Sequence, residues 1–324
     1  MTPVLQVRGL TRRFGSATAV AGIDLDVAQG EIFGLVGPNG AGKTTTLRML
    51  ATLLPPSGGD ARVMGHSIRR EPDAVRQLIG WMPDSFGVYD DMRVWEYLDF
   101  FARCHGIPAA RRKRLIDDLL ELVDLGPKRD AYVEALSRGM QQRLCLAHAL
   151  VHEPPLLLLD EPASGLDPRA RVELRELLRE LRAMGRTIVV SSHILPELEE
   201  LCTAVAIIDH GRVLASGRVD EIQGRFRQGS VARVSILGGE EATVAAAAWF
   251  TGQPEAAGVE LLPDGRIELA LRGDAEAAAA LLARAVGGGL RVAAFAPAAS
   301  DLEELFLQIT AGEAHEGGEA GVAA

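Results

Sequence analysis

The chain has 324 residues, of which 48% are hydrophobic and 24% charged, an ordinary composition for a globular protein. Its 34 basic and 44 acidic side chains give a net charge of -10, which argues against a broad nucleic-acid-binding surface. No uncharged apolar stretch reaches the ~18 residues that span a bilayer, and no signal-peptide pattern begins the chain. We therefore expect a cytosolic chain of about two domains that does not itself cross a membrane.

The N-terminal segment has the alternating pattern of strands at residues 5–8 and 19–27, followed by an apolar run at 32–36. Phe14 lies between the first two of these segments. An aromatic ring there could stack on the flat face of an adenine base. It could equally be part of the hydrophobic core, and its residue type alone leaves both interpretations open.

A phosphate-binding loop follows the apolar run and precedes a helical pattern at 47–50. Its glycines leave open a concavity of backbone N–H groups, and the N-terminus of the helix adds positive potential. Lys43 supplies a charge for the β- and γ-phosphates, and Thr44 supplies a hydroxyl for Mg²⁺. The loop predicts that the chain binds a nucleoside triphosphate, and it consists of Gly37, Pro38, Asn39, Gly40, Ala41, Gly42, Lys43, Thr44 and Thr45.

The stretch from about 94 to 143 contains few strand signals, and its apolar residues recur with helical spacing. We expect a helical insertion within an α/β domain. Ser137 and Gly139 precede a helix predicted at 141–151, where Ser-x-Gly on its own indicates only a helix cap. The cysteines at 104, 145 and 202 lie in apolar helical contexts without a C-x-x-C spacing, which predicts buried free thiols.

A second group of polar residues follows buried strands in the middle of the chain. Asp160 and Glu161 end the apolar run 155–159, as expected for a central parallel strand with acids at its carboxyl end. An Asp at this place in phosphate-loop enzymes holds Mg²⁺, and Glu161 could polarise an attacking water from the other side of the strand. His193 ends the strand predicted at 187–191, where it could contact a γ-phosphate or serve a structural role.

The last third of the chain has a different texture. Residues 205–215 predict a hairpin and 219–229 a polar connection. Beyond them the order is strand (232–237), helix (240–250), strand (258–262), strand (267–271), helix (275–286) and strand (290–294). This β-α-β-β-α-β order is ferredoxin-like. A capping box predicts a final helix at 301–309, and the Ala/Gly/Glu-rich tail from 311 is predicted to be disordered.

Together these motifs resemble the nucleotide-binding subunit of an ABC transporter, over residues 1 to about 220. The resemblance implies a RecA-like phosphate-loop core with an antiparallel β subdomain and the helical insertion. It implies that Phe14 stacks on adenine, that Glu161 is the general base and that His193 is the switch histidine. It also implies that residues 136–140 are the signature motif and 164–167 the D-loop. Residues of these two segments that would bind ATP are Ser137, Arg138, Gly139 and Asp167.

The chain departs from the usual family pattern at two places. Arg138 and Met140 occupy signature positions where the family usually has Gly and Gln. Asp84 aligns with the lid residue, commonly Gln, that reaches Mg²⁺; because Asp is shorter and charged, it could bind the metal directly or fail to reach it. Both departures resemble ATPase subunits of type-2 ABC exporters, whose permease is a separate chain. The segment 300–306 is also similar to that branch.

The predicted function is an ATPase that uses ATP and Mg²⁺ to power a membrane exporter. The resemblance implies a homodimer on the cytoplasmic face of the membrane and a separate multi-pass permease. We expect a nucleotide-binding domain at 1–222 with its helical insertion at about 88–150, an accessory domain at 223–310 and a tail at 311–324. A cluster of large apolar residues predicts a permease socket near 84–97, although part of it could be core; its members are Phe86, Val88, Tyr89, Trp95 and Tyr97.

Two alternatives have a different function. A soluble ABC ATPase acting on ribosomes or DNA usually has two nucleotide domains or a long coiled-coil insertion, and neither is seen. A regulatory protein that binds ATP without hydrolysing it stays open because of Asp84. The sequence names neither the exported substrate nor the permease.

Overall fold

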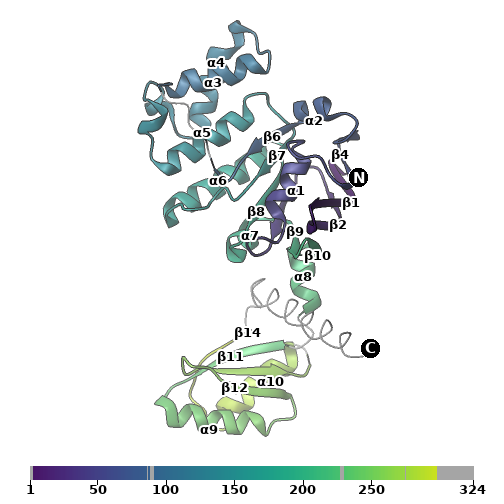
Figure 1. The fold of residues 1–324 in the computed structure, drawn as a ribbon. Helices are drawn as coiled ribbons and strands as arrows, with labels where there is room; N and C mark the ends of the chain where they lie inside the picture. Colours follow the sequence, from purple (N-terminus) through teal and green to yellow (C-terminus); the bar gives the residue numbers. More distant parts are fainter. Residues whose placement is uncertain (1–2, 86, 88–90, 227–229, 274, 298–324) are drawn as a thin grey trace, which may run out of the picture. The chain divides into compact units, whose positions relative to one another are not determined.

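The computed structural model describes residues 3–85, 87, 91–226, 230–273 and 275–297 (Figure 1). In these residues no helix is both long and apolar enough to span a bilayer. The chain divides into two compact units, the first ending at Val219 and the second beginning at Asp220. Each unit has its own hydrophobic core.

A six-stranded sheet forms the centre of the first unit, with the strand order β10-β9-β3-β8-β7-β6. All neighbouring strands are parallel except β10, which pairs antiparallel with β9. The central strands are apolar and buried along their length because helices cover both faces of the sheet. The strands are β3 (Ile32–Val36), β6 (Ile79–Met82), β7 (Leu156–Leu159), β8 (Thr187–Ser192), β9 (Ala204–Asp209) and β10 (Arg212–Arg218).

An antiparallel sheet of order β2-β1-β4-β5 shares a hydrophobic core with the central sheet. Side chains such as Val7 and Leu25 join Phe33 and Leu47 in that core. Strand β1 extends to Phe14, beyond the predicted 5–8, because its second half pairs with β2 through register shifts. The elements are β1 (Leu5–Phe14), β2 (Ala17–Val27), β4 (Gly58–Val63), β5 (His66–Ser67), α1 (Lys43–Leu50) and α2 (Pro72–Leu78).

The predicted helical insertion is present as α3 (Val94–Cys104), α4 (Ala109–Leu122) and α5 (Arg138–Leu150), with short 3-10 turns at Gly126–Lys128 and Val133–Ala135. Tyr97 is 2% exposed, so it is core and not part of a socket. Phe86, Val88 and Tyr89 lie outside the described residues. Cys104 is exposed at the end of α3, which corrects its predicted burial, whereas Cys145 and Cys202 are buried.

Histidines join the insertion to the central sheet. The ring of His105, after α3, stacks on the ring of His152, after α5, with 4.0 Å between centroids. The ring of His148 lies 3.8 Å from that of Phe101, and Nε2 of His152 is 2.9 Å from the carbonyl oxygen of Ile79 in β6. Burial lowers the pKa of His148 and of His152 to about 4, and the neighbouring imidazoles add to the effect. These rings are therefore neutral at pH 7.

Helices α6 (Pro168–Ala183) and α7 (Leu195–Leu201), like α1, begin at the carboxyl edge of the sheet. Helix α8 (Val219–Phe226) follows β10. Helix α6 follows the turn after β7, and Asp167 accepts a hydrogen bond from the backbone N–H of Ala170 as its N-cap. Helix α7 follows β8 after His193. Both turns therefore place polar residues where ligands bind in open parallel sheets.

The second unit has the predicted ferredoxin-like order, with antiparallel strands in the order β12-β13-β11-β14. Its core includes Val234, Phe250, Leu269 and Leu281. The predicted final helix and tail lie outside the described residues. The elements are β11 (Ser230–Ile236), α9 (Gly239–Thr251), β12 (Ala256–Leu261), β13 (Ile267–Leu271), α10 (Ala275–Gly287) and β14 (Val292–Pro297).

Candidate active site

The loop between β3 and α1 lies against neighbouring backbone. A Cβ added to Gly37 would lie 2.1 Å from the carbonyl oxygen of Ile208, and one added to Gly42 would lie 2.5 Å from that of Ala19. Gly42 also has φ of 106°, in the left-handed region that favours glycine. The two glycines thus let the loop close on β9 and β2. Its tip, from Pro38 to Gly40, is exposed.

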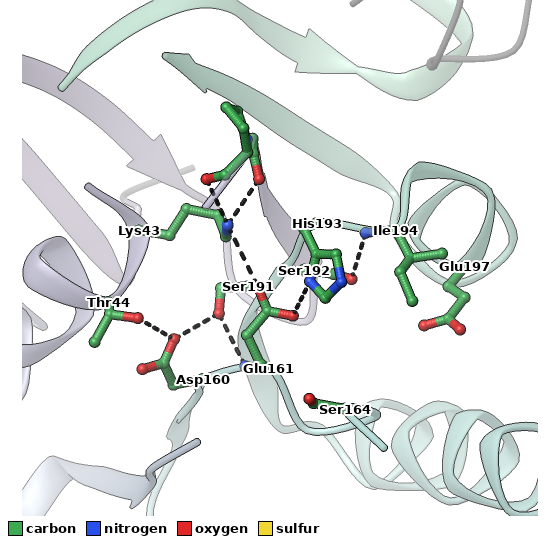
Figure 2. Close-up of polar contacts among 12 residues, drawn as sticks. Lys43, Thr44, Asp160, Glu161, Ser164, Ser191, Ser192, His193, Ile194 and Glu197 are labelled. Atoms are coloured by element: carbon green, nitrogen blue, oxygen red, sulfur yellow. Dashed lines mark hydrogen bonds and ion pairs between the residues drawn. The ribbon is translucent and has the colours of Figure 1, made fainter. Parts of the chain in front are cut away.

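Lys43 begins α1, and its side chain is 5% exposed. Its Nζ donates hydrogen bonds to the carbonyl oxygens of Gly37 at 2.7 Å and Pro38 at 3.1 Å. The same nitrogen lies 3.3 Å from Oε1 of Glu161 (Figure 2). A buried ammonium is stable only with such partners. The loop therefore holds a fixed positive charge at its own centre.

Asp160 follows β7 and is 1% exposed. Its Oδ1 accepts hydrogen bonds from Oγ1 of Thr44 at 3.0 Å and from Oγ of Ser191 at 2.8 Å. Its Oδ2 is buried and has no hydrogen-bond partner in the described part of the chain. Burial raises the pKa of this carboxyl, and the negative charges of Asp84 and Glu161 act in the same direction. A bound cation would satisfy both the charge and the unpartnered oxygen.

Ser191, in β8, joins the two acidic residues and was not among the predicted site residues. Its hydroxyl donates to Asp160 and accepts a hydrogen bond from the backbone N–H of Glu161 at 2.9 Å. Both neighbours sit at the carboxyl end of β7, and β8 pairs with β7 in parallel register. The only sequence signal for Ser191 was a hydroxyl at the end of a buried strand.

Glu161 points away from Asp160, as predicted. Its Oε2 lies 2.8 Å from Nδ1 of His193, and its carboxyl is 13% exposed (Figure 2). Its φ of 49° is in the left-handed region, which a residue other than Gly or Asn adopts at a cost of about 1 kcal/mol or more. The backbone turn thus holds the Glu161 carboxylate between the Lys43 ammonium and the His193 ring.

The predicted signature residues lie at the start of α5. Ser137 is the exposed N-cap, and its hydroxyl is 3.4 Å from the backbone nitrogen of Met140. Gly139 is half-buried. The exposed Arg138 side chain lies against Gly165, where an added Cβ would be 2.3 Å from its Cζ. Within the described ranges, no hydrogen bond or ion pair joins these residues to the cluster around Lys43.

Two other predicted site residues, Phe14 and Asp84, lie outside the hydrogen-bonded cluster around Lys43. Phe14 is 48% exposed, and the guanidinium of Arg12 lies 4.6 Å from its ring centroid. Its exposure disfavours the core interpretation of this ring. Asp84 is exposed just after β6; in the residues with described positions its side chain makes no hydrogen bond or ion pair, although its charge acts on Asp160. Thr45 is half-buried in the first turn of α1.

Comparison with known proteins agrees with this geometry. The family model described as ABC transporter matches residues 20–164. The Nod factor export ATP-binding protein I of Ralstonia nicotianae is 43% identical, with coverage of 68% of this chain and 69% of the relative. The daunorubicin/doxorubicin resistance ATP-binding protein DrrA of Streptomyces peucetius is 40% identical, covering 68% and 67%. The linearmycin resistance ATP-binding protein LnrL of Bacillus subtilis is 31% identical, covering 95% and 98%.

A solved structure of the ATP-binding subunit of an ABC transporter superimposes with a TM-score of 0.63 at 31% identity, covering 69% of this chain and 93% of that one. The matched residues 20–164 include the phosphate loop, Asp160 and Glu161, and the relatives named above are ATP-binding proteins of export or drug resistance. They do not favour a soluble ATPase that acts on ribosomes or DNA. The chain therefore belongs to the ABC transporter family, as an ATP-binding and ATP-hydrolysing subunit of the exporter branch that works with a membrane permease.

Proposed function

We propose that two copies of this chain enclose two ATP molecules with Mg²⁺ and that hydrolysis drives a separate multi-pass permease from the cytoplasmic face of the membrane. The observation that carries the proposal is the continuous polar network from Thr44 through Asp160 and Ser191 to Glu161, which also contacts Lys43 and His193. At the end of one phosphate loop, the network brings together the Lys43 ammonium, the Glu161 carboxylate and the His193 ring.

The oxygen donors beside the loop fit Mg²⁺. Thr44 offers a hydroxyl, and Asp160 offers a buried carboxylate with an unpartnered oxygen. Asp84 is close enough for its charge to act on Asp160 and is proposed as a further donor. When bound, Mg²⁺ supplies positive charge that neutralises phosphate oxygens. Ser191 donates to the same Oδ1 of Asp160 as Thr44 does and so helps to hold the carboxylate in place.

Glu161 is proposed as the general base. In this structure Oε1 of its carboxylate forms an ion pair with Nζ of Lys43 at 3.3 Å. A phosphate group that binds Lys43 competes for the same charge, which leaves the carboxylate to accept a proton from an attacking water. His193, held at 2.8 Å from Oε2, then orients the carboxylate and reaches the γ-phosphate. Hydrolysis by this route needs Lys43, Glu161 and His193 together. Because the chain has all three, the site argues against a protein that only binds ATP.

The second half of each site is proposed to come from the facing copy. Ser137, Arg138 and Gly139 form an outward-facing helix start whose hydroxyl, guanidinium and backbone N–H groups suit a γ-phosphate. Asp167 and the D-loop would connect the two sites. Such reciprocal contacts close with two-fold symmetry.

The coupling surface is proposed on α3. A hollow of about 320 Å³ there is lined by apolar side chains beside acidic and basic ones, namely Met92, Trp95, Glu96, Asp99, Phe100 and Arg103. Trp95 belongs to the predicted socket, and Phe100 is 44% exposed. This mixture of aromatic and charged groups suits an amphipathic helix of a permease.

The test is to solubilise membranes that contain tagged Glu161→Gln protein with ATP and to identify what co-purifies. The variant should trap the ATP-bound dimer, and a multi-pass membrane protein in stoichiometric amount is expected. Glu176→Gln, at a 61% exposed side chain on α6, is the matched control that still hydrolyses ATP. Ribosomal or DNA-repair proteins in place of a membrane chain, or normal phosphate release by Glu161→Gln, would contradict the proposal.

A further inference from the structure

Helices α6 and α7 are separated by a cavity of about 220 Å³. Its apolar lining includes Leu174 and Leu178 of α6 and Leu198 and Leu201 of α7, and Pro162 and Ser192 reach it from the ends of β7 and β8. Helix α7 instead packs tightly on β3, where a Cβ added to Gly34 would lie 3.4 Å from Cδ1 of Leu198. Apolar packing therefore fixes α7 to the sheet but leaves a gap toward α6.

Arginines bridge this gap. Arg171, Arg175 and Arg179 recur every four residues, which places them on one face of α6. Nη1 of Arg171 lies 2.7 Å from Oε1 of Glu197, Arg175 pairs with Glu200, and Arg179 donates to the backbone carbonyl of Glu200. These polar contacts hold α7, the helix that follows His193, at its distance from α6.

Arg171 differs from the other two arginines because it also holds the D-loop. Its Nε donates a 3.0 Å hydrogen bond to the carbonyl oxygen of Leu166, while Nη1 contacts Glu197. A guanidinium presents these donors in a rigid planar fork, so movement of one partner displaces the other. The D-loop and the helix after His193 thus share a single side chain.

We propose that Arg171 is a positioning residue that transmits the position of the D-loop, through Glu197 and α7, to His193 and so to Glu161. The inference rests on the proposed function, in which the D-loop meets the facing copy. The adjacent cavity matters because close-packed interiors resist displacement, whereas the cavity of about 220 Å³ between α6 and α7 leaves α7 room to shift. Closure of the dimer would therefore set the geometry of the general base.

The test is steady-state ATPase kinetics of the full chain with Arg171→Gln. We expect kcat to fall about tenfold or more, because small misplacements of catalytic groups have such effects, with the KM for ATP unchanged. Glu197→Gln should lower kcat less, because Arg171 keeps its hydrogen bond to the carbonyl oxygen of Leu166. The double variant should have a kcat no lower than that of Arg171→Gln alone. Arg171→Lys should recover part of the activity, since its ammonium can reach one partner.

Arg169→Gln is the matched control. Arg169 is on the same helix, is 89% exposed and pairs with Glu173 one turn away. Because Arg171 is 37% exposed, its loss should move the Tm by no more than about 3 °C, as for other partly exposed ion pairs. Kinetics equal to those of Arg169→Gln, a raised KM, or a kcat loss that follows a larger fall in Tm would overturn the inference. Glu161→Gln is assayed in parallel: normal hydrolysis by that variant sinks the proposed function itself, whereas an inactive Glu161→Gln with an active Arg171→Gln sinks only the role of Arg171.

Discussion

The two halves of the proposed site differ in how the chain holds them. Around the phosphate loop, Lys43 and Asp160 are 5% and 1% exposed, and each has charged or hydroxyl partners from other elements. At the start of α5, Ser137 and Arg138 are exposed, with the Ser137 hydroxyl near the backbone nitrogen of Met140 and the Arg138 side chain against Gly165. A buried charged group is costly unless it is paired or hydrogen-bonded, so the buried groups have partners within the same chain. The exposed half has no such constraint, which suits its proposed role toward a second copy.

The largest expected effect tests the buried half. Lys43→Ala removes the positive charge from the centre of the loop, so we expect ATP affinity to fall about 100-fold or more, as for other buried charge-assisted contacts. Fluorescent-nucleotide titration measures this loss. Lys113→Ala, at an exposed position on α4, should bind ATP as the unaltered chain does. Unchanged affinity in the Lys43 variant would contradict the loop assignment.

Low pH should weaken the packing of the helical insertion, which carries Ser137, on the central sheet. His148 and His152 have pKa values of about 4, below the ordinary 6.5, so the unfolded chain binds more protons between these pH values. Their stabilising contribution is complete above pH 6.5 and is lost as the pH falls toward 4. Denaturant titrations from pH 7 to 4.5 measure this slope.

His148→Phe keeps the ring contact with Phe101 and should remove about half of that acid dependence. Leu53→Ala, at a 60% exposed side chain that does not titrate, is the control and should keep the full slope. An identical slope in all three proteins would mean that His148 binds its proton equally well in the folded and the unfolded chain.

Gly139→Asp separates the two halves directly. A Cβ at Gly139 meets nothing closer than 3.4 Å, so the fold tolerates the change, but the carboxylate would repel a phosphate. In the Glu161→Gln background we expect the ATP-dependent dimer to weaken about tenfold or more while each monomer keeps its ATP affinity. Analytical ultracentrifugation with and without ATP measures both species. Loss of monomer binding would place Gly139 in the first half of the site.

Ser191→Ala is the smallest change and tests the network between Asp160 and Glu161. It leaves the backbone N–H of Glu161 without its partner, which costs about 1–3 kcal/mol for a buried group. We expect a modest fall in Tm and about a tenfold fall in kcat, with Ser191→Thr recovering most of both. Thermal scans and ATPase assays measure the two effects. Full activity in Ser191→Ala would show that Thr44 alone fixes the carboxylate.

The buried half of the site was largely predictable because its residues belong to short motifs with fixed spacing in the sequence. The phosphate loop after β3 and the two acids after β7 lie at the same carboxyl edge of one parallel sheet, with only β8 between the two strands. Ser191 was missed because its contact depends on the β7–β8 register, which no local pattern encodes. The burial of Tyr97 and the exposure of Cys104 depend on how α3 packs, so an apolar helical pattern did not distinguish them.

Cys104 has a practical consequence. Cys145 and Cys202 are buried, and burial raises the pKa of both thiols, for Cys145 to about 12. Because the thiolate is the reactive form, a maleimide dye at neutral pH should attach at Cys104 alone. That position ends α3, which borders the proposed permease surface. The natural sequence thus already contains a single attachment point for a fluorophore, with which the helical insertion could be followed during each turnover without engineered residues.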